Sequence, residues 1–277
     1  MFYNVKEGKL TLGGMDFDYI TFGSGGKPLV MIQGLNTRGI KGAGFSLAYL
    51  YRIFAGDFRV YLFDRRPVVE DGFTVREMAG DVAMAMDALG ISGAAVFGVS
   101  QGGMIAQYLA IDRPDLVEKL VLAVTLSRNN ETVIRVVESW IRMARQGEMA
   151  RLVADMAEKM YSEAYLKRYR PFLPLLTVLQ KPKDVERFAI LAKSCLTCDT
   201  YELLDRIQCP VLVLGGAKDQ VVTGEASREI AQKRNCRLHL YENLGHAAYE
   251  EARDFNGRVY DFLQSCGTEE KCHARMV

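Results

Sequence analysis

Residues 94–104 read Ala-Ala-Val-Phe-Gly-Val-Ser-Gln-Gly-Gly-Met, and this stretch decides the fold. An apolar run typical of a buried strand stops at Ser100, and a helical pattern begins directly after it. Together with its flanking glycines, Ser100 fits the pattern G-x-S-x-G, in which a sharp strand-to-helix turn exposes the serine hydroxyl. Such a turn brings backbones close together and favours residues without a β-carbon, a need that Gly98, Gly102 and Gly103 meet. The stretch therefore predicts a nucleophile elbow.

Short apolar runs of the same kind recur on both sides of the elbow. They lie at residues 28–32, 58–63, 120–124 and 210–214. Continuous rather than alternating apolar runs are typical of strands buried on both faces of a parallel sheet. Helical patterns separate the runs, at residues 44–55, 74–89, 101–111 and 223–234, the second of them opening with the capping box Thr74-x-x-Glu77. This alternation predicts a doubly wound α/β core.

The two ends of the chain complete this core. Residues 2–22 alternate apolar and polar positions around glycine-rich breaks, which is typical of an antiparallel edge hairpin. Residues 236–242 predict a last strand, and residues 248–264 predict one closing helix.

Residues 128–199 break the alternation, because they offer helical patterns with no strand between them. Apolar side chains follow helical spacing over 133–144 and 149–160, and a further helix is predicted over 183–194. We expect residues 1–127 and 200–277 to form the core domain and residues 128–199 to form an inserted helical lid over the carboxyl ends of the strands, where ligands bind in open α/β folds. The aromatic residues of this lid either line an apolar pocket or pack the lid against itself.

Composition limits the kind of partner. The 277 residues carry 35 basic and 34 acidic side chains, a formal net charge of +1, which offers no field to attract nucleic acid or an anionic membrane. No apolar run approaches the roughly 20 residues that span a bilayer, and the first residues do not resemble a signal peptide. We expect a cytoplasmic protein with a small-molecule substrate, and the sequence leaves the oligomeric state open. The pair Cys195-x-x-Cys198 resembles half of a zinc site, but we expect it to pack in the core and expect no bound metal.

A serine nucleophile needs a base, and that base needs a third group to orient it. Among the three histidines, His239 lies within an alternating strand and His273 lies in a polar tail, whereas His246 follows the last predicted strand. Asp219 follows the strand at 210–214. The order Ser100, Asp219, His246 is the order of the catalytic triad in α/β-hydrolases.

The segments Val30-Met-Ile-Gln33-Gly34, Phe63-Asp64-Arg65-Arg66 and Gly245-His246, together with the elbow, make the chain resemble the α/β-hydrolase superfamily. The similarity points to its branch of lidded esterases, enol-lactonases and carbon–carbon bond hydrolases. It implies an α/β fold with a mostly parallel eight-stranded sheet whose first strands are antiparallel, a lid inserted after the sixth strand, and no cofactor. It also implies an oxyanion hole formed by the backbone N–H groups of Leu35 and Gln101.

Two segments depart from the pattern of this superfamily. Gln33 replaces the histidine of its His-Gly pair, so the loop that follows must be supported differently. The residues predicted to contact substrate, which otherwise serve as turn formers or lid packing, are Gln33, Asn36, Arg38, Trp140 and Tyr161. After Asp64 the chain continues with Arg65-Arg66-Pro67 instead of a glycine turn. We interpret this segment as a remodelled surface loop, with an arginine that binds an anionic substrate group as the alternative.

Three functions are consistent with these residues. The leading one is a serine hydrolase that acts on a small carboxylic ester or lactone through Ser100, His246 and Asp219. The same triad also serves carbon–carbon bond hydrolysis or elimination. The third is a non-catalytic small-molecule receptor that keeps the fold, since function depends on the site and not on the fold alone.

Overall fold

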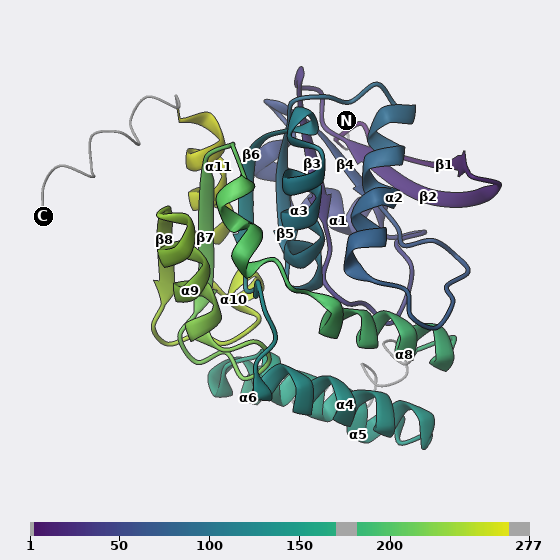
Figure 1. Ribbon diagram of the computed structural model, residues 1–277, viewed down its shortest axis with the longest axis vertical. Helices are drawn as coiled ribbons and strands as arrows, with labels where there is room; N and C mark the ends of the chain where they lie inside the picture. The colour runs from purple at the N-terminus through teal and green to yellow at the C-terminus, as the bar shows by residue number, and fades with distance from the viewer. Residues whose placement is uncertain (1–2, 170–181, 266–277) are drawn as a thin grey trace, which may run out of the picture.

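The computed structural model describes residues 3–169 and 182–265, and its centre is an eight-stranded sheet (Figure 1). The strands are β1 (Lys6–Leu12), β2 (Met15–Phe22), β3 (Lys27–Ile32), β4 (Phe58–Phe63), β5 (Ala94–Val99), β6 (Val117–Ala123), β7 (Val211–Gly216) and β8 (Arg237–Tyr241). Their spatial order is β1-β2-β4-β3-β5-β6-β7-β8. Strand β2 runs antiparallel to β1 and β4, and the remaining pairs are parallel. This confirms the predicted mostly parallel sheet and its antiparallel beginning.

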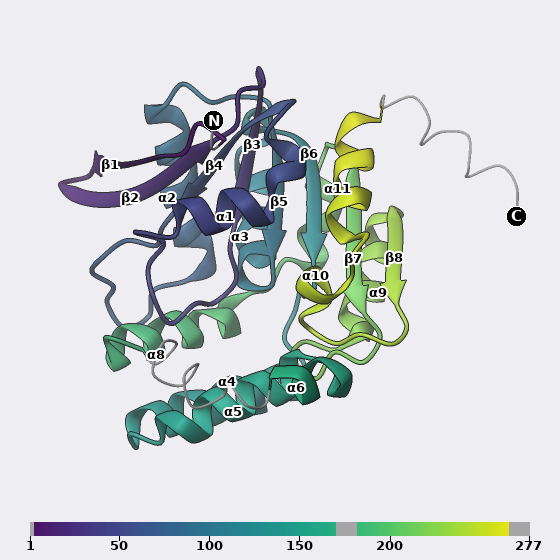
Figure 2. The same ribbon diagram turned by 180° about the vertical axis from the view of Figure 1, so that it is seen from behind.

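Helices cover both faces of the sheet. They are α1 (Gly44–Leu50), α2 (Val75–Ala88), α3 (Gln101–Asp112), α4 (Glu131–Arg145), α5 (Met149–Met160), α6 (Glu163–Tyr169), α8 (Val185–Ser194), α9 (Gly224–Arg234), α10 (Ala248–Glu251) and α11 (Phe255–Gln264). Short 3-10 turns join them at η1 (Arg52–Phe54), η2 (Pro114–Leu116), η4 (Cys195–Thr197) and η5 (Tyr201–Arg206). Helices α2, α3 and α9 lie on the face seen in Figure 1, and α1 and α11 lie on the face seen in Figure 2.

Each central strand contributes to two apolar cores, one on each face. Along β5, Val96 packs into the core beneath α2 and α3, while Phe97 packs into the core beneath α1 and α11. All six residues of β5 are buried. Because both faces are covered, the strand needs apolar residues at successive positions, which explains the continuous runs in the sequence.

Two predicted helices are each broken in the structure. The helix predicted over 44–55 ends at Leu50, because Tyr51 leaves helical geometry (φ −103°, ψ 22°) before η1 turns Phe54 into the core. The helix predicted over 248–264 is split into α10 and α11, because Ala252 is extended (φ −77°, ψ 117°). The break redirects the chain so that Phe255 is fully buried at the start of α11.

The helical segment between β6 and β7 lies beyond the carboxyl ends of the central strands, below the sheet in both views (Figures 1 and 2). It contains α4, α5, α6 and α8, and of these α6 was not predicted separately. Arg128 and Asp199 form an isolated antiparallel bridge, so the two ends of the segment meet beside the core. The sequence of this segment also contains Pro171, Phe172 and Pro174, which fall outside the described residues. Within the described ranges, no helix is long and apolar enough to cross a membrane.

The capping box of α2 is present as predicted from the sequence. The Glu77 amide donates to Thr74 Oγ1 at 3.1 Å, and the Thr74 amide donates to Glu77 Oε2 at 2.8 Å.

Replacing Thr74 by alanine removes the acceptor for a helix amide that has no partner within the helix. We expect T74A to lower the free energy of unfolding by about 1 kcal/mol in urea denaturation. T74S keeps the hydroxyl and should stay near wild type; equal losses in both variants would contradict this role for the cap.

Candidate active site

Ser100 sits in a strained turn between β5 and α3. Its backbone angles, φ 54° and ψ −119°, are unusual for a residue with a side chain and cost about 1–3 kcal/mol. Hydrogen bonds fix the turn: the Ser100 amide donates to the Ala123 carbonyl at 2.8 Å, and the Ser100 carbonyl accepts from the Gly103 amide at 2.8 Å, the Thr125 hydroxyl at 2.7 Å and the Met104 amide at 3.2 Å. The predicted elbow geometry is therefore present at Ser100.

The flanking glycines permit the close packing that this turn requires. A β-carbon on Gly98 would lie 2.4 Å from the Gly102 carbonyl oxygen, and one on Gly102 would lie 1.9 Å from the Ile32 carbonyl oxygen. Both contacts are with backbone atoms, which cannot rotate away. The start of α3 can therefore pack directly on the end of β3 only where these residues have no side chain.

The structure brings Ser100, His246 and Asp219 into one chain of hydrogen bonds. His246 Nε2 lies 2.9 Å from Ser100 Oγ, and His246 Nδ1 lies 2.7 Å from Asp219 Oδ2. His246 and Asp219 are buried, with 3% and 7% of their surface exposed, while Ser100 is half-buried. With a proton on Nδ1 held by the carboxylate, Nε2 is free to accept the serine proton.

Backbone hydrogen bonds hold the two loops that supply the acid and the base. The Ala217 amide donates to the Tyr241 carbonyl at 3.0 Å, and the Lys218 amide donates to the Leu244 carbonyl at 2.9 Å. The second oxygen of Asp219 accepts from the Val221 and Val222 amides at 2.7 and 3.0 Å. The two backbone amides thus orient the Asp219 carboxylate, and the oriented carboxylate holds the His246 imidazole in one position.

The His246 loop is also joined to the helical segment beneath the sheet. The Ala247 amide donates to the Met160 carbonyl, the last residue of α5, at 2.8 Å. Two residues later the Ser162 amide donates to Glu251 at 2.8 Å, and the Ser162 hydroxyl bonds the same carboxylate. The residue that follows the candidate base therefore shares a main-chain bond with the end of α5.

Tyr161, predicted to contact substrate, lies at this junction instead of in the cavity over Ser100. Its hydroxyl donates to Glu250 at 2.7 Å, and its ring stacks on Tyr165 with centroids 4.7 Å apart. Burial and the neighbouring Glu250 carboxylate raise the pKa of Tyr161 well above its ordinary value. Tyr161 is thus occupied in joining α5 to α10.

A small apolar cavity of about 50 Å³ opens over Ser100. Its lining consists of Gly34, Leu35, Ser100, Met104, Val133, Val137, Trp140, Met156, Met160, Cys195, Val221, Val222, His246 and Tyr249. Trp140, predicted to contact substrate, is part of this lining, and its indole N–H donates to Asp155 at 2.8 Å. Among the described residues, the lining includes no Asp, Glu, Lys or Arg side chain. The cavity is suited to a small uncharged group.

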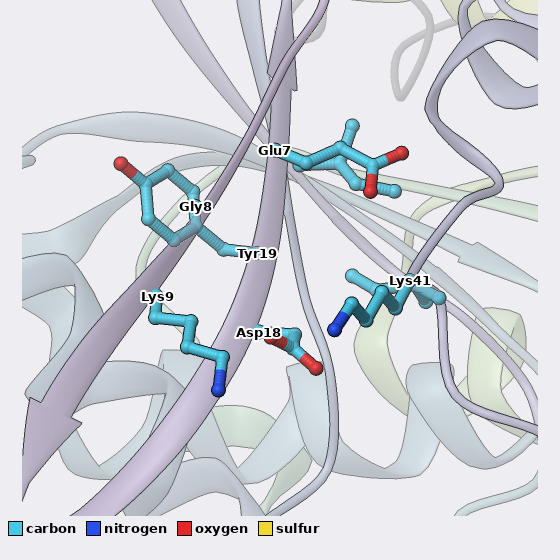
Figure 3. A pocket seen from close by; sticks show the side chains of 8 residues that line it. Glu7, Gly8, Lys9, Asp18, Tyr19 and Lys41 are labelled. Atoms are coloured by element: carbon cyan, nitrogen blue, oxygen red, sulfur yellow. The ribbon is translucent and has the colours of Figure 1, made fainter.

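Another hollow, of about 120 Å³, lies between the β1–β2 hairpin and the loop before α1 (Figure 3). Its lining includes Glu7, Gly8, Asp18 and Tyr19, and no residue of the predicted site. The Glu7 carboxylate there accepts from the Gly42 and Gly44 amides at 2.9 Å each, so it is used to hold the loop.

The residues predicted to form the oxyanion hole flank Ser100. A β-carbon on Gly34 would lie 3.3 Å from Ser100 Cβ, so the chain that leads into Leu35 passes against the serine. Gln101 is the first residue of α3, and the first amides of a helix have no partner within it. The buried side chain of Gln101 donates to the Leu191 carbonyl at 2.7 Å, which ties α8 to the elbow.

Three other residues predicted to contact substrate, Gln33, Asn36 and Arg38, are half-buried on the loop after β3 and do not belong to the lining of the cavity described above. Asn36 Nδ2 donates to Gln33 Oε1 at 3.3 Å, so these two side chains bond each other. The structure thus shows Gln33 and Asn36 supporting the loop that carries Leu35.

In the segment that we interpreted as a remodelled surface loop, Pro67, Val68 and residues 70–72 are exposed, but the side chains of Arg65 and Arg66 turn toward the protein. Arg66 forms a two-pronged ion pair with Asp81, its Nε lying 2.8 Å from Oδ2, and lies over the Phe73 ring. Arg65 is buried, with 8% of its surface exposed. The sequence did contain a signal for the ion pair, because Asp81 shares the apolar face of α2 with Met78 and Val82, and a carboxylate on a buried face needs a cationic partner.

The cysteine pair and His239 do not belong to the hydrogen-bond chain described above. Cys195 and Cys198 are buried thiols, and burial raises the pKa of Cys195 to about 11, which keeps it protonated and poorly nucleophilic. His239 lies on β8 with its ring 4.5 Å from that of Tyr241. His273 falls outside the described residues.

Residues 27–253 match the family of the alpha/beta hydrolase fold, so the chain belongs to this family and is an α/β-fold hydrolase. It is 30% identical over 237 residues to the "Putative carbamate hydrolase RutD" of Caulobacter sp. (strain K31), covering 81% of this chain and 88% of that protein. A 2-hydroxy-6-oxononadienedioate/2-hydroxy-6-oxononatrienedioate hydrolase of Paraburkholderia xenovorans (strain LB400) is 27% identical, over 95% of this chain and 94% of its own. The fold is also similar to the crystal structure of the enol-lactonase from Burkholderia xenovorans LB400, with a TM-score of 0.80 at 23% identity, covering 93% of this chain and all of that one.

The packing of Gly102 on β3 can be tested by adding one methyl group. G102A places a β-carbon 1.9 Å from the Ile32 carbonyl oxygen, so β3 or α3 must shift. We expect a loss of about 1–3 kcal/mol in the free energy of unfolding and a loss of activity, because β3 leads into Leu35. Gly80 is the matched control: it is exposed within α2 with no atom within 4 Å of its β-carbon position, and G80A should stabilise the protein by about 0.5–1 kcal/mol. A neutral G102A would contradict the packing.

Proposed function

We propose that this protein is a serine hydrolase that cleaves a small carboxylic ester or lactone, with Ser100 as nucleophile, His246 as base and Asp219 as the orienting acid. The observation that carries the proposal is the unbroken chain of hydrogen bonds from Asp219 through His246 to Ser100, at 2.7 and 2.9 Å, beside an apolar cavity. A serine hydroxyl is a poor nucleophile at neutral pH, and the hydrogen bond to His246 supplies the base that activates it.

Acylation begins when Ser100 Oγ bonds to the carbonyl carbon of the substrate. His246 Nε2 takes the hydroxyl proton, and the π pair of the carbonyl moves onto its oxygen. The tetrahedral intermediate then collapses, the bond from carbon to the leaving oxygen breaks, and His246 returns its proton to that oxygen. The products are an alcohol and an acyl-enzyme; with a lactone the alcohol stays attached to the acyl chain.

Deacylation repeats these steps with water as the nucleophile. Water gives one proton to His246 Nε2 while its oxygen bonds to the acyl carbon, and collapse returns that proton to Ser100 Oγ as the carboxylic acid leaves. Asp219 remains ionised and stabilises the imidazolium in both halves of the reaction.

The backbone N–H groups of Leu35 and Gln101 would hold the negative oxygen of each tetrahedral intermediate. The position of Gly34 against Ser100 and of Gln101 at the start of α3 supports this role. A preorganised donor of this kind contributes about 3–4 kcal/mol to transition-state stabilisation, and the positive end of a helix adds to it.

The lining of the cavity favours an uncharged acyl group. The side chains contributed by α4 and α5, which include Val133, Val137, Trp140 and Met156, are apolar or aromatic. Carbon–carbon bond hydrolysis is the second candidate, supported by the similarity over 95% of the chain to a hydrolase named for a dicarboxylate. A dicarboxylate needs a cationic partner in the site, and the part of the lining that the structure describes is uncharged, which favours the ester or lactone.

We further propose that residues 128–199 act as a lid on a core formed by residues 1–127 and 200–277. The side chains of α4 and α5 that line the cavity support this division, and so does the Arg128–Asp199 bridge at the two ends of the segment. A lid of this kind excludes water and completes the site around a bound substrate.

Replacement of the nucleophile tests the proposed chemistry. We expect S100A to lose at least about 1,000-fold in kcat on short-chain p-nitrophenyl esters and to resist labelling by a fluorophosphonate probe that labels the wild type. The control is S46A, an exposed serine on α1. Full turnover by folded S100A would overturn the assignment.

Trp140, the only tryptophan of the chain, reports on the cavity. Labelling Ser100 with a fluorophosphonate should change the intensity or wavelength of its emission, because the adduct fills the space that the indole lines. S100A treated with the same reagent is the control and should show no change. A fully labelled wild-type protein with unchanged emission would contradict the proposed contact between lid and substrate.

A further inference from the structure

Arg65 lies behind the loop that leads to Leu35. It follows the carboxyl end of β4, while Gln33 follows the end of the neighbouring parallel strand β3. One terminal nitrogen of its guanidinium group donates to the Gln33 carbonyl at 2.7 Å. Since Gln33 precedes Gly34 and Leu35, this bond fixes the backbone directly before the proposed oxyanion donor.

The charge of Arg65 is buried near the Asp64 carboxylate, whose attraction partly offsets the lowering of its pKa by burial, but the two groups do not form an ion pair. Among the described residues, no carboxylate oxygen lies within ion-pair distance of its guanidinium, and its buried Nε has no hydrogen-bond partner. The adjacent Asp64 accepts from the Ile40 amide at 2.9 Å and from the backbone amide of Arg65 at 2.8 Å, so it is held by main-chain groups. The neighbouring Arg66 differs, because it is paired with Asp81.

This arrangement is costly for folding. A cation that is removed from water loses solvation, and one hydrogen bond to a neutral carbonyl recovers only part of it. Burial lowers the pKa of Arg65 to about 10, so the side chain still carries its charge at neutral pH. An apolar side chain in the same space would lose no ionic solvation on folding. We therefore expect the charge to have a role in the proposed reaction.

The surroundings connect this charge to the reaction. Arg65 donates to the carbonyl of Gln33, and the two residues that follow Gln33, Gly34 and Leu35, line the cavity over Ser100. From α8, Arg187 donates to the Arg65 and Arg66 carbonyls at 3.3 and 3.0 Å, which holds the backbone of this turn in place. A rigid positive charge in a low-dielectric environment stabilises negative charge that appears nearby.

We propose that Arg65 is a positioning residue of the oxyanion hole: it fixes the Gln33 carbonyl, and its buried charge favours the negative tetrahedral intermediate. This inference rests on the proposed hydrolase function. It also accounts for the support of a loop in which Gln33 stands in place of the expected histidine. Because Arg65 acts on the transition state, its loss should lower kcat more than it changes KM.

The experiment compares R65M, R65K and a matched control on a neutral p-nitrophenyl ester and on a p-nitrophenyl ester whose acyl group carries a carboxylate. We expect R65M to lose about 10- to 100-fold in kcat with KM within about twofold, and R65K to lose less because it keeps the charge. R65M should also bind a trifluoromethyl ketone more weakly, in proportion to its loss in kcat/KM, since the serine adduct of that ketone carries the oxyanion. The control is R234M. Arg234, at the end of α9, is half-buried, and its guanidinium donates to the Cys209 carbonyl at 3.3 Å. Loss of this side chain should lower the free energy of unfolding and leave kcat unchanged.

Three results would overturn the inference while leaving the hydrolase function intact. One is a folded R65M with wild-type kcat and ketone affinity. Another is a rise in KM confined to esters that carry a carboxylate, which would make Arg65 a substrate-binding group. If R65M does not fold, the kinetics of R65K take its place in the test. The third overturning result is a folded R65K with a raised KM and an unchanged kcat. Failure of the wild-type protein to hydrolyse any ester or lactone would instead count against the proposed function.

Discussion

The close packing of the elbow on β3 is the constraint on which the rest of the site depends. The strained backbone of Ser100 persists because α3 begins directly against the Ile32 carbonyl, at a distance that only Gly102 permits. This contact sets the serine beside Gly34 and beside the amide of Gln101. Contacts from both neighbouring strands, β3 and β6, thus hold the strained backbone of Ser100. The residues of the proposed site lie around a hydroxyl whose position is fixed.

The parts of the fold that were predictable from sequence are those set by local patterns. The strands follow from their continuous apolar runs, and the start of α2 follows from Thr74 and Glu77, because each signal lies within a few residues. The order of Ser100, Asp219 and His246 placed all three at strand ends, and the structure brings them within hydrogen-bond distance.

The features that were missed depend on contacts between distant residues. Neither glycine nor proline marks the break between α10 and α11, where Ala252 becomes extended. The hydroxyl of Tyr161 is taken by Glu250, 89 residues away in the chain. The guanidinium of Arg65 donates to the carbonyl of Gln33, which follows the neighbouring strand and lies 32 residues earlier in the chain. Periodicity carries no information about such pairs, which tertiary packing alone determines.

The bond between the Ala247 amide and the Met160 carbonyl joins main chain to main chain. Such a bond makes no demand on side-chain identity, so substitutions along α5 can reshape the cavity while the end of the helix keeps its register on the histidine loop. The side chains of α5 that line the cavity can therefore be changed while the main-chain link between the end of the helix and the loop of the proposed base is kept. The shape of the cavity and the position of His246 are in this sense set by different parts of the chain.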